Sequence, residues 1–479
     1  MPIKFGTDGW RAIIAKDYTF ANVQICAQAV CNLLKSNKEE YKGIVIGYDT
    51  RFLSREFAQS VAQVTTANNI TTYLCDRSAP TPVIAHNVTS KKAAGGIVIT
   101  ASHNPPNWNG FKYKPDYGGS ASTEIVKAIE KEIFKINRTD LVKSLSLNEL
   151  ESNPYLKYFN PNPSYIKHIS SLIDLEIIKN SGLSIAIDSM YGSGSGYLST
   201  ILAGGSTKTS EINNEFNPSF PTIKQPEPIK QNLNNLISLI KSNTNIDIGL
   251  ATDGDADRLG VINEKGEYIS TLEVFSLIAL YKLKILNQRG PIVKSITMTN
   301  MINKLGNIYK VPIYETPVGF KHLGKVMMEK DALLAGEESG GYAFKGNIPE
   351  RDGILSALIF LEMLVRMKKN PSDLVKMLFK EVGKHVYQRI DLEINEKDKT
   401  LLYDRIKSWN PTKIGSLFVT NKENKDGYKY TLEEGYWALV RFSGTEPLLR
   451  LHVEGKSHSH IKQILEEINS ILFNKKVVT

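Results

Sequence analysis

The stretch "IDIGLATDGDADR", residues 246–258, joins a continuous apolar run to a loop that carries three carboxylates. Hydrophobicity that continues along a short run, rather than alternating, is typical of a strand buried on both faces of an α/β sheet. Similar runs precede polar loops at 43–51, 95–104, 183–194 and 291–300, and helical patterns lie between such runs, for example at 21–35 and 355–367. The alternation predicts several layered α/β units.

The chain has 479 residues, enough for three or four domains of roughly 150 residues each. Proline-bearing polar stretches at 152–163 and 368–373 are interpreted as linkers, and the hairpin pattern "NEKGEY" indicates a softer boundary near 270. The expected domains are 1–151, 152–270, 271–370 and 371–479. The last differs in character: "YWALVRFSGTEPLLRLHVEG" predicts two strands around a loop, and a helix with apolar residues at helical spacing follows it. This pattern predicts a small α+β domain.

Composition is that of a soluble globular protein, with 41% hydrophobic and 23% charged residues. The net charge is +9, and the excess of basic residues is interpreted first as charge on a solvated surface. A basic cleft that binds an anionic small molecule is the next interpretation. No basic stripe interleaved with aromatic residues indicates a nucleic-acid partner. Three cysteines without a CxxC pair indicate neither a disulfide framework nor a zinc site. Without an apolar signal core or a run of eighteen apolar residues, we expect a cytoplasmic protein with no membrane segment.

The loop at 251–262 predicts a metal site. Its three carboxylates, Asp253, Asp255 and Asp257, are two residues apart, and carboxylates this close need a cation between them. Mg²⁺ fits this ligand set. A calcium-binding EF-hand does not, because no glutamate occupies the twelfth place and a strand precedes the loop. A solvated acidic turn remains the alternative.

Mg²⁺ often takes its remaining ligands from a phosphate, which directs attention to Ser102 in "GGIVITASHNPPNWNGFK", residues 95–112. A buried strand ends just before this serine, but a serine hydroxyl is a weak nucleophile unless a base or a metal activates it. Taken alone, Asn-Pro-Pro is equally well explained as a turn.

Two further loops carry polar groups suited to a phosphorylated sugar. "RFSGTEPLLR", residues 441–450, offers a guanidinium, two hydroxyls and a glycine, which together indicate either an anion site or an ordinary polar hairpin. In "AGEESGGYAFKGNIPERDG", residues 335–353, a carboxylate and a hydroxyl at alternate positions could bind adjacent sugar hydroxyls. On its own this second pattern is also common in solvated turns.

In this order, the four loops resemble those of the α-D-phosphohexomutase family, the phosphoglucomutases and phosphomannomutases. The resemblance extends from "FGTDGWR" at 5–11 to "RFSGTEP" at 441–447, nearly the whole chain. It implies an α/β fold with three related mixed α/β domains plus a smaller C-terminal α+β domain around a central cleft, with one loop from each domain.

The resemblance also implies roles for individual residues. Ser102 matches the phosphorylated serine and, with Asp253, Asp255 and Asp257, the Mg²⁺ site. Lys112 matches a residue that helps proton transfer, provided that neighbouring cations lower its pKa. His103 and Arg11 match positions near the phosphoserine. The positions matching substrate contacts are Arg258, Gly319, Lys321, His322, Glu337, Ser339, Arg441, Ser443, Gly444 and Thr445.

One departure concerns the sugar loop, which ends in Ser-Gly-His in some bacterial phosphomannomutase-type members but has Gly341 here. The sequences "GEESGG" and "NIPERDG" look closer to the phosphoglucomutase branch. The resemblance therefore implies a cytoplasmic isomerase, monomeric or homodimeric. It would interconvert hexose 1-phosphate and hexose 6-phosphate, with glucose as the expected sugar. The reaction would pass through a phosphoserine and a hexose 1,6-bisphosphate, and the bisphosphate would also serve as activator.

Alternatives remain at this point. A phosphomannomutase or a dual-specificity mutase would use the same four loops. A metal-dependent phosphatase with a serine nucleophile would share Ser102 and the acidic loop, but would need no separate sugar and phosphate loops. A binding-only relative is the third alternative, although damage to the serine or metal loop would then be expected.

Overall fold

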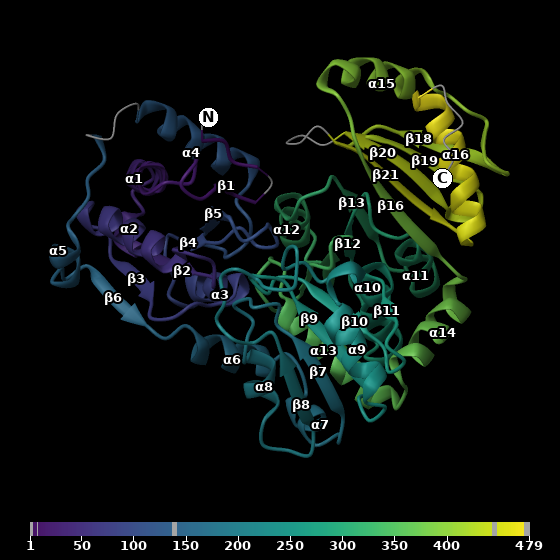
Figure 1. Cartoon of the computed structure of the whole chain (residues 1–479), viewed down its shortest axis with the longest axis horizontal. Coiled ribbons are helices and arrows are strands. Elements are labelled where there is room, and N and C mark those ends of the chain that lie inside the picture. Colours follow the sequence, from purple (N-terminus) through teal and green to yellow (C-terminus); the bar gives the residue numbers. More distant parts are fainter. Residues whose placement is uncertain (1–2, 7, 137–140, 443–447, 474–479) are drawn as a thin grey trace.

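The structure is a computed structural model that describes residues 3–6, 8–136, 141–442 and 448–473. Four β-sheets follow one another along the sequence, so each sheet defines one unit of the chain (Figure 1). The first three sheets combine parallel strands, antiparallel strands and intervening helices, and the fourth is antiparallel with two helices. The expected fold class, three mixed α/β domains plus a C-terminal α+β domain, is confirmed.

The first unit holds a six-stranded sheet in the order β1-β5-β4-β2-β3-β6. Its strands are β1 (Trp10–Ile13), β2 (Ile44–Tyr48), β3 (Thr72–Cys75), β4 (Gly95–Ile99), β5 (Trp108–Pro115) and β6 (Leu156–Phe159). Its helices are α1 (Phe20–Ser36), α2 (Ser54–Ala67), α3 (Thr81–Ser90), α4 (Thr123–Lys135), α5 (Leu147–Glu151) and a 3₁₀ turn at Glu40–Lys42. Strand β4 is buried along its whole length, as its apolar run predicts, and the loop after it carries Ser102.

The stretch 152–163 is more than the expected linker, because it contains β6 and the start of α6 (Asn162–Ser170). Strand β6 pairs in parallel with β3 at the edge of the first sheet, and its side chains are half-buried or exposed. An edge strand needs no two-sided apolar run, which explains why the sequence pattern does not indicate it. The first sheet therefore extends beyond residue 151.

The second unit has a five-stranded sheet in the order β11-β10-β9-β7-β8. Its strands are β7 (Ser184–Asp188), β8 (Lys208–Ile212), β9 (Ile248–Thr252), β10 (Leu259–Ile262) and β11 (Tyr268–Ile269). Besides α6 it contains α7 (Leu175–Lys179), α8 (Tyr197–Leu202), α9 (Asn234–Ser242) and a 3₁₀ turn at Lys230–Asn232. Strands β9 and β10 form an antiparallel hairpin that closes at Thr252 and Leu259, so the acidic loop is the tip of this hairpin.

The third unit has a four-stranded sheet in the order β13-β12-β14-β15. Its strands are β12 (Ile292–Ser295), β13 (Ile313–Thr316), β14 (Leu334–Gly336) and β15 (Tyr342–Phe344). Its helices are α10 (Thr271–Leu280), which continues as a π-helix at Tyr281–Ile285, α11 (Met301–Tyr309), α12 (Phe320–Glu329), α13 (Gly353–Met367) and α14 (Pro371–Val382). Helix α14 occupies part of the expected linker at 368–373 and packs on α10 and α11. On packing grounds we place the start of the fourth unit after α14.

The fourth unit is an antiparallel sheet in the order β16-β21-β20-β19-β18-β17. Its elements are β16 (Val386–Glu393), α15 (Glu396–Ser408), β17 (Lys413–Ile414), β18 (Leu417–Glu423), β19 (Tyr428–Leu432), a 3₁₀ turn at Glu433–Gly435, β20 (Trp437–Phe442), β21 (Leu448–Gly455) and α16 (His458–Phe473). As predicted, β20 and β21 are paired strands, and Leu449, Leu451 and Val453 are buried in one cluster with the apolar residues of α16. Of the expected phosphate loop, Ser443, Gly444 and Thr445 lie outside the described residues.

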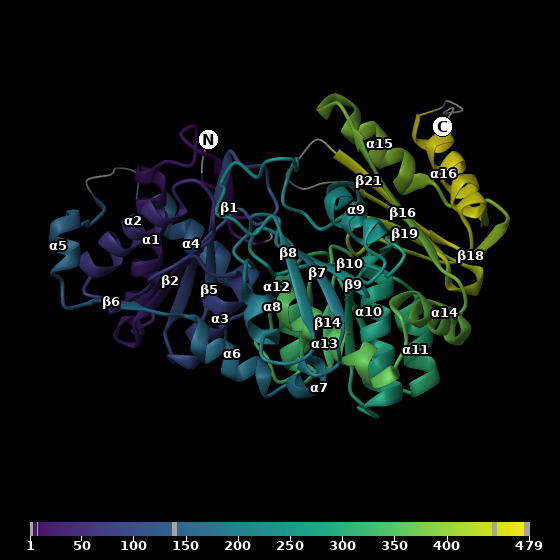
Figure 2. The same ribbon diagram turned by 60° about the horizontal axis from the view of Figure 1, so that its bottom comes forward.

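The two largest hydrophobic clusters of the described residues separate the first three units from the fourth. One runs through the first three units, from Phe5 to Val382, and the other lies within the fourth unit, from Ile394 to Leu472. The fourth unit meets the third through a small apolar contact of Ile296 with Trp437 and Leu439. A second viewing direction again shows the first and fourth units at opposite ends (Figure 2).

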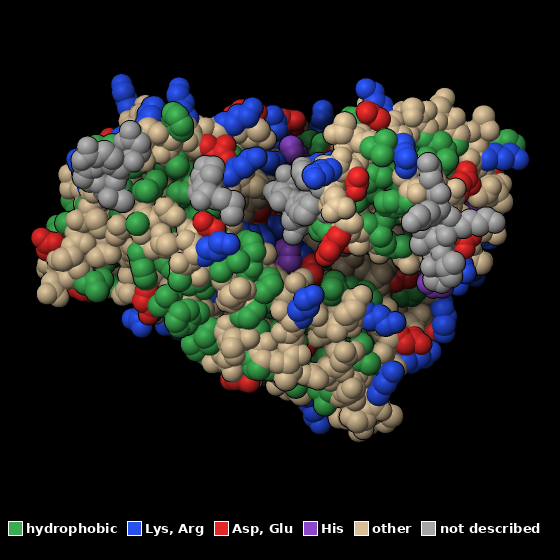
Figure 3. All heavy atoms as spheres, turned by 45° about the horizontal axis from the view of Figure 1, so that its top comes forward, with side chains coloured by type: hydrophobic (Ala, Val, Ile, Leu, Met, Phe, Trp, Pro, Cys, Tyr) green, Lys and Arg blue, Asp and Glu red, His purple; other side chains and the backbone are tan. Residues whose placement is uncertain are grey.

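One face of the molecule is hollowed near its middle. Lys, Arg and His side chains lie around this hollow together with Asp and Glu side chains (Figure 3). Within the described part of the chain, the apolar helices are too short to cross a membrane.

Candidate active site

The loop after β4 holds Ser102 in a strained, fully buried position. Its φ angle is +52°, in the left-handed region that a non-glycine residue seldom adopts. The Ser102 amide donates to Thr100 Oγ1 at 2.8 Å. Strain of this kind persists only where the surroundings fix it and is concentrated at functional sites.

Arg51, which follows β2, fixes this loop from behind. Its guanidinium donates to the carbonyl oxygens of Ser102 and Asn104, both at 2.6 Å, and to those of Pro105 at 2.8 Å and Trp108 at 3.1 Å. Burial lowers the pKa of Arg51 to about 10, with Asp49 acting in the opposite direction, so the side chain stays charged at neutral pH. Arg51 is absent from the predicted site residues, although it ends one of the stretches, 43–51, in which an apolar run precedes a polar loop.

The acidic loop brings the three predicted metal ligands together. The ligand oxygens of Asp253, Asp255 and Asp257 lie within 4.8 Å of one another, and all three side chains are buried. Asp255 Oδ1 and Asp257 Oδ1 accept no hydrogen bond from the described residues, whereas Asp257 Oδ2 is 2.9 Å from Arg351. Buried carboxylate oxygens without donors are costly unless a cation binds them. The residues present therefore fit a divalent cation.

The pKa values of the three aspartates reflect how closely their charges are packed in the loop. Burial, and then the neighbouring Asp257 and Asp255, raise the pKa of Asp253 well above its usual range. Burial also raises the pKa of Asp257. For Asp255, burial is outweighed by Lys112 and by the hydroxyl of Thr81, and the pKa is lowered.

The serine loop and the acidic loop are in direct contact. Ser102 Oγ donates to Asp253 Oδ2 at 2.8 Å, across 151 residues of sequence. Close approach depends on Gly254, because a Cβ atom there would lie 2.5 Å from the carbonyl oxygen of Ser102. At the first turn of α3, Thr81 donates to Asp255 through its amide at 3.0 Å and through its hydroxyl at 2.6 Å. Ser102 and Thr81 belong to the first unit, so both contacts join the first and second units.

Lys112, on β5, lies among anions rather than among the cations that its expected role requires. Its ammonium is 2.8 Å from Asp255 and from Asp8, and 3.6 Å from Asp257. Burial lowers the pKa of Lys112, but these three carboxylates outweigh burial and raise it above the usual lysine value. The expected lowering by neighbouring cations is thus not found, because the nearest groups carry negative charge.

Three predicted basic residues lie around Ser102. His103 Nδ1 is 3.3 Å from Ser102 Oγ, and Arg11 donates to Asn104 Oδ1 at 2.8 Å. Arg258 bonds Glu227 at 2.9 Å and approaches Asp253 at 3.8 Å. Burial, followed by the charges of Arg258 and Arg11, lowers the pKa of His103 well below its usual range. The imidazole is therefore uncharged at neutral pH.

The sugar loop connects β14 and β15, and its carboxylate is anchored. Glu337 is buried and accepts a hydrogen bond from the amide of Gly319 at 2.8 Å. Gly319 has a φ of +120°, which disfavours any other residue there. Burial raises the pKa of Glu337. Ser339 is half-buried, and Lys321 and His322 occupy half-buried positions in the first turn of α12.

Gly341, where a histidine stands in some relatives of the resembled family, lies against Arg351. A Cβ atom at this position would be 2.3 Å from Arg351 Cδ, so the arginine fills the space that a side chain would need. Arg351 forms ion pairs with Asp8 at 2.6 Å and Asp257 at 2.9 Å, and its guanidinium lies 3.9 Å from Glu337. It thereby links the metal loop to the sugar loop. The sequence prediction misses this arginine, although it stands within "NIPERDG".

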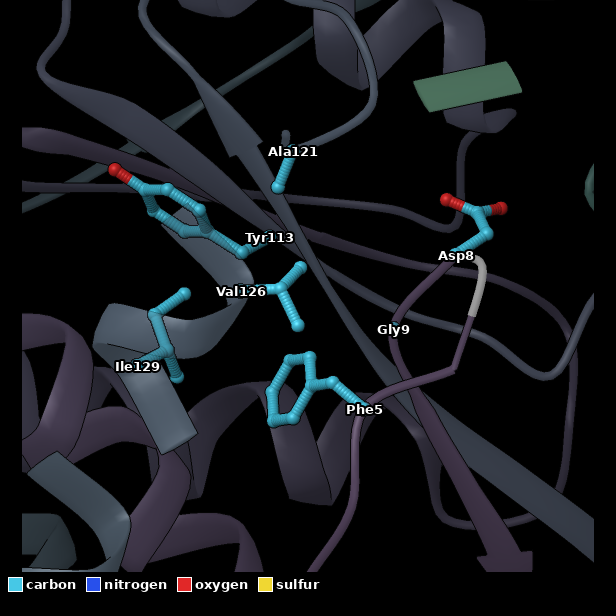
Figure 4. Close-up of a pocket in the computed structure, with 7 residues that line it drawn as sticks. All are labelled: Phe5, Asp8, Gly9, Tyr113, Ala121, Val126 and Ile129. Atoms are coloured by element: carbon cyan, nitrogen blue, oxygen red, sulfur yellow. The ribbon is translucent and has the colours of Figure 1, made fainter. Parts of the chain in front are cut away.

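Asp8 is also missed, although it lies within the quoted motif at 5–11. It joins Lys112, Lys114 and Arg351, and these cations outweigh burial and lower its pKa. Phe5, Asp8 and Gly9 of this segment line a cavity of about 10 Å³, and the carboxylate of Asp8 points away from the apolar side chains on the cavity's other side (Figure 4). Lys114 continues the network to Glu350 at 2.6 Å.

Arg441, at the end of β20, is the described residue of the expected phosphate loop. Its Nε donates to Asp426 Oδ1 at 2.9 Å, and Asp426 Oδ2 accepts from the amide of Val318 at 2.9 Å. Asp426 therefore connects the phosphate loop to the segment before Gly319. No sequence pattern indicates this aspartate.

Comparison with known proteins covers nearly the whole chain. The family profile described as phosphoglucomutase/phosphomannomutase, alpha/beta/alpha domain I, matches residues 2–140, and those for domains II, III and the C-terminal domain match 163–266, 273–382 and 394–471. A phosphoglucomutase/phosphomannomutase of Thermococcus kodakarensis is 30% identical over 466 residues, which is 96% of each protein. The chain belongs to the phosphoglucomutase/phosphomannomutase family. It is therefore a phosphohexomutase, an isomerase that acts as an intramolecular phosphotransferase.

Relatives in this family differ in the sugar that their names state. A phosphoglucosamine mutase of Methanocaldococcus jannaschii is 30% identical, over 90% of this chain and 91% of its own. The structure of a protein described as a phosphomannomutase from Thermus thermophilus superposes with a TM-score of 0.85 at 30% identity, covering 98% of this chain and 99% of that one. Membership of the family thus establishes the reaction type, while the names leave the sugar open.

Proposed function

We propose that this phosphohexomutase interconverts the 1-phosphate and 6-phosphate of a hexose, preferably glucose, through phosphorylated Ser102 and a hexose 1,6-bisphosphate. One observation carries the proposal. Ser102 Oγ, strained and buried at the end of β4, lies 2.8 Å from Asp253 of a carboxylate triad contributed by the second unit. A hydroxyl placed beside a divalent-cation site and three basic side chains is suited to carry a phosphoryl group.

The proposed transfer balances in atoms and protons. The bond between phosphorus and Ser102 Oγ breaks, and a bond forms between phosphorus and the free hydroxyl oxygen of the hexose monophosphate. The sugar hydroxyl loses a proton and Ser102 Oγ gains one. The bisphosphate then turns end for end, and its other phosphate returns to Ser102, which releases the isomeric monophosphate.

Asp253, Asp255 and Asp257 would hold Mg²⁺, together with the phosphate on Ser102. When bound, the cation supplies charge stabilisation to the transferring group. Arg11 and Arg258 add permanent positive charge around Ser102. His103, kept uncharged by its surroundings, lies close enough to the serine hydroxyl to exchange a proton with it.

The role proposed for Lys112 differs from the proton transfer that the resemblance implies. Held charged by three carboxylates, it is a poor proton acceptor. It is well placed to hold Asp8 beside the acidic loop and to reduce repulsion within that loop. Its proposed contribution is therefore electrostatic.

The remaining predicted residues are proposed to bind different parts of the substrate. Glu337 and Ser339 bind hydroxyls near the middle of the sugar, which keep similar positions after the turn, and Gly319, Lys321 and His322 line the neighbouring segment. Arg441 binds the phosphate that is not reacting, with the loop at 443–445. These assignments rest on the positions of the residues in the family motifs and on the buried, anchored carboxylate of Glu337.

Intact-mass measurement on the purified enzyme tests the proposal. Incubation with glucose 1,6-bisphosphate should add the mass of one phosphoryl group, and proteolytic mapping should place it on Ser102. The phosphorylated enzyme should convert glucose 1-phosphate to glucose 6-phosphate without releasing inorganic phosphate. Steady release of phosphate without isomerisation would instead show a phosphatase, and binding without either reaction would show a binding-only protein.

A further inference from the structure

We propose that Asp426 is a positioning residue that orients Arg441 toward the substrate phosphate and ties it to the segment that carries Gly319. The inference rests on the proposed function, because it assigns Arg441 to a phosphate of the hexose. It concerns a residue of the fourth unit that lies outside the four loops described above.

Asp426 lies in the tight turn between β18 and β19, beside the end of β20. Its Oδ1 accepts from Arg441 Nε and its Oδ2 accepts from the amide of Val318, both at 2.9 Å. The side chains of Arg441 and Asp426 are only 14% and 22% exposed. The next residue, Gly427, has a φ of +98°, and a Cβ atom there would lie 2.6 Å from the carbonyl oxygen of Val440. The turn is thus pressed against β20, which fixes the aspartate beside the arginine.

The hydrogen bond from Arg441 Nε to Asp426 leaves the terminal nitrogens of the guanidinium for an anion to bind. A guanidinium offers five N–H groups in one plane. Asp426 engages the Nε group and thereby fixes the plane, and no other described residue hydrogen-bonds the terminal nitrogens, whose N–H groups can bind a phosphate. A preoriented guanidinium loses less conformational entropy when it binds its ligand.

Asp426 also reduces repulsion between two neighbouring arginines. Arg441 on β20 stands directly opposite Arg450 on β21. Like charges at directly opposed positions destabilise a sheet. Each arginine has a carboxylate partner: Asp426 is 2.9 Å from Arg441, and Asp391 is 3.5 Å from Arg450. Without Asp426, Arg441 would be free to turn away from Arg450.

The second oxygen of Asp426 connects phosphate binding to sugar binding. Val318, which donates to it, precedes Gly319, and the amide of Gly319 donates to Glu337 at 2.8 Å. Three consecutive contacts therefore run from Arg441 through Asp426 and residues 318–319 to the sugar carboxylate. This chain of contacts sets the distance between the group proposed to hold the phosphate and the group proposed to hold the sugar hydroxyls.

The test compares Asp426→Ala with Asp426→Asn, which keeps the shape of the side chain but not its charge. We expect Asp426→Ala to raise the KM for glucose 1-phosphate about tenfold with kcat nearly unchanged, as befits loss of uniform binding. Asp426→Asn, which can keep one of the two acceptor contacts, should give a smaller rise. Glu423→Gln in the same hairpin, where Glu423 pairs with Lys425, is the matched control and should leave KM unchanged.

A double-mutant cycle separates positioning from general damage. If Asp426 acts through Arg441, Asp426→Ala should have little further effect on KM in the Arg441→Ala background. Equal factors in both backgrounds, or an unchanged KM in either Asp426 variant, would overturn the proposal. Failure of the proposed function would be seen in the wild-type enzyme, which would then neither bind hexose phosphates in calorimetry nor isomerise them. The role proposed for Asp426 would fail as well in that case.

Discussion

Ser102, the residue proposed to carry the phosphoryl group, is held in a strained backbone conformation. Two hydrogen bonds maintain its positive φ. The guanidinium of Arg51 donates to the carbonyl oxygen of Ser102, and the Ser102 amide donates to the hydroxyl oxygen of Thr100. The same carbonyl oxygen faces Gly254 so closely that a Cβ atom there would meet it at 2.5 Å. The strain is therefore fixed from both units, which holds the hydroxyl beside Asp253.

Ser102→Ala should abolish the transferable phosphate while leaving the fold intact, since only one oxygen is removed. We expect kcat to fall about a thousandfold or more, as when other enzymes lose their nucleophile. A coupled assay for glucose 6-phosphate measures the loss, and thermal unfolding verifies the fold. Turnover close to that of the wild type would contradict the phosphoserine mechanism.

Asp255→Asn should weaken the metal site, because one of three closely spaced carboxylates becomes neutral. We expect the Mg²⁺ concentration for half-maximal activity to rise and kcat to fall about a hundredfold, since a bound cation contributes several kcal/mol to such transfers. Calorimetric titration of the resting protein with Mg²⁺ gives a readout independent of activity.

The control for this variant is Asp247→Asn, in the same unit, where the carboxylate bonds the amide of Ser184 away from the triad. It should retain the Mg²⁺ affinity of the wild type. Full activity of the wild-type enzyme after exhaustive chelation would exclude the metal site altogether.

Candidate site residues could be located from the sequence where they directly follow a buried strand. Asp253 and Ser102 follow continuous apolar runs, so their strands and their loops can be located together. Arg51, Arg351 and Asp426 could not be assigned in the same way. Each acts on residues distant in the sequence, and an isolated arginine or aspartate in a turn has no pattern that distinguishes it from solvated surface.

At the scale of elements, the loop after β4 depends on the fork geometry of Arg51, which reaches four carbonyl oxygens. Arg51→Lys keeps the charge but offers a compact ammonium that cannot span the same acceptors. We expect kcat to fall between about tenfold and a hundredfold as the serine loop loses its alignment, with a lower melting temperature. Arg55→Lys on the exposed side of α2 should change neither quantity. Wild-type kcat in Arg51→Lys would show that the loop holds its shape without the guanidinium.

The elements themselves could be predicted where burial leaves a pattern. Strands β2, β4 and β9 are buried at every position, and each matches an apolar run. Strand β6 is the contrary case, because a half-exposed edge strand among prolines carries no such run. Helix α14 begins with a proline, a residue that suits a first helical turn but that is equally typical of a linker, which is what the polar stretch 368–373 predicts.

At the scale of the whole molecule, the site exists only because the units are held together. Arg351 from the third unit forms ion pairs with Asp8 from the first unit at 2.6 Å and with Asp257 from the second at 2.9 Å. Hundreds of residues separate Asp8 from Arg351, so local periodicity could not predict their contact. The resemblance to a family predicted that the loops converge, but the ion pairs that hold them together required the structure.

The choice of sugar also belongs to the whole molecule, since the third and fourth units both contact it in the proposed mechanism. Glu337 and Ser339 are proposed to bind the hydroxyls at C3 and C4, which are arranged alike in glucose and mannose. Discrimination at C2 would need a separate polar contact, and none is assigned among the proposed sugar-binding residues. We therefore expect glucose 1-phosphate to give the highest kcat/KM and mannose 1-phosphate to react more slowly, by about tenfold, the modest factor that sites without a dedicated polar contact achieve. Comparing the two, with glucosamine 1-phosphate as a third substrate, measures the preference directly. A higher kcat/KM for mannose or glucosamine would show that an additional contact at C2 selects the sugar, while the phosphoserine chemistry at Ser102 would stand.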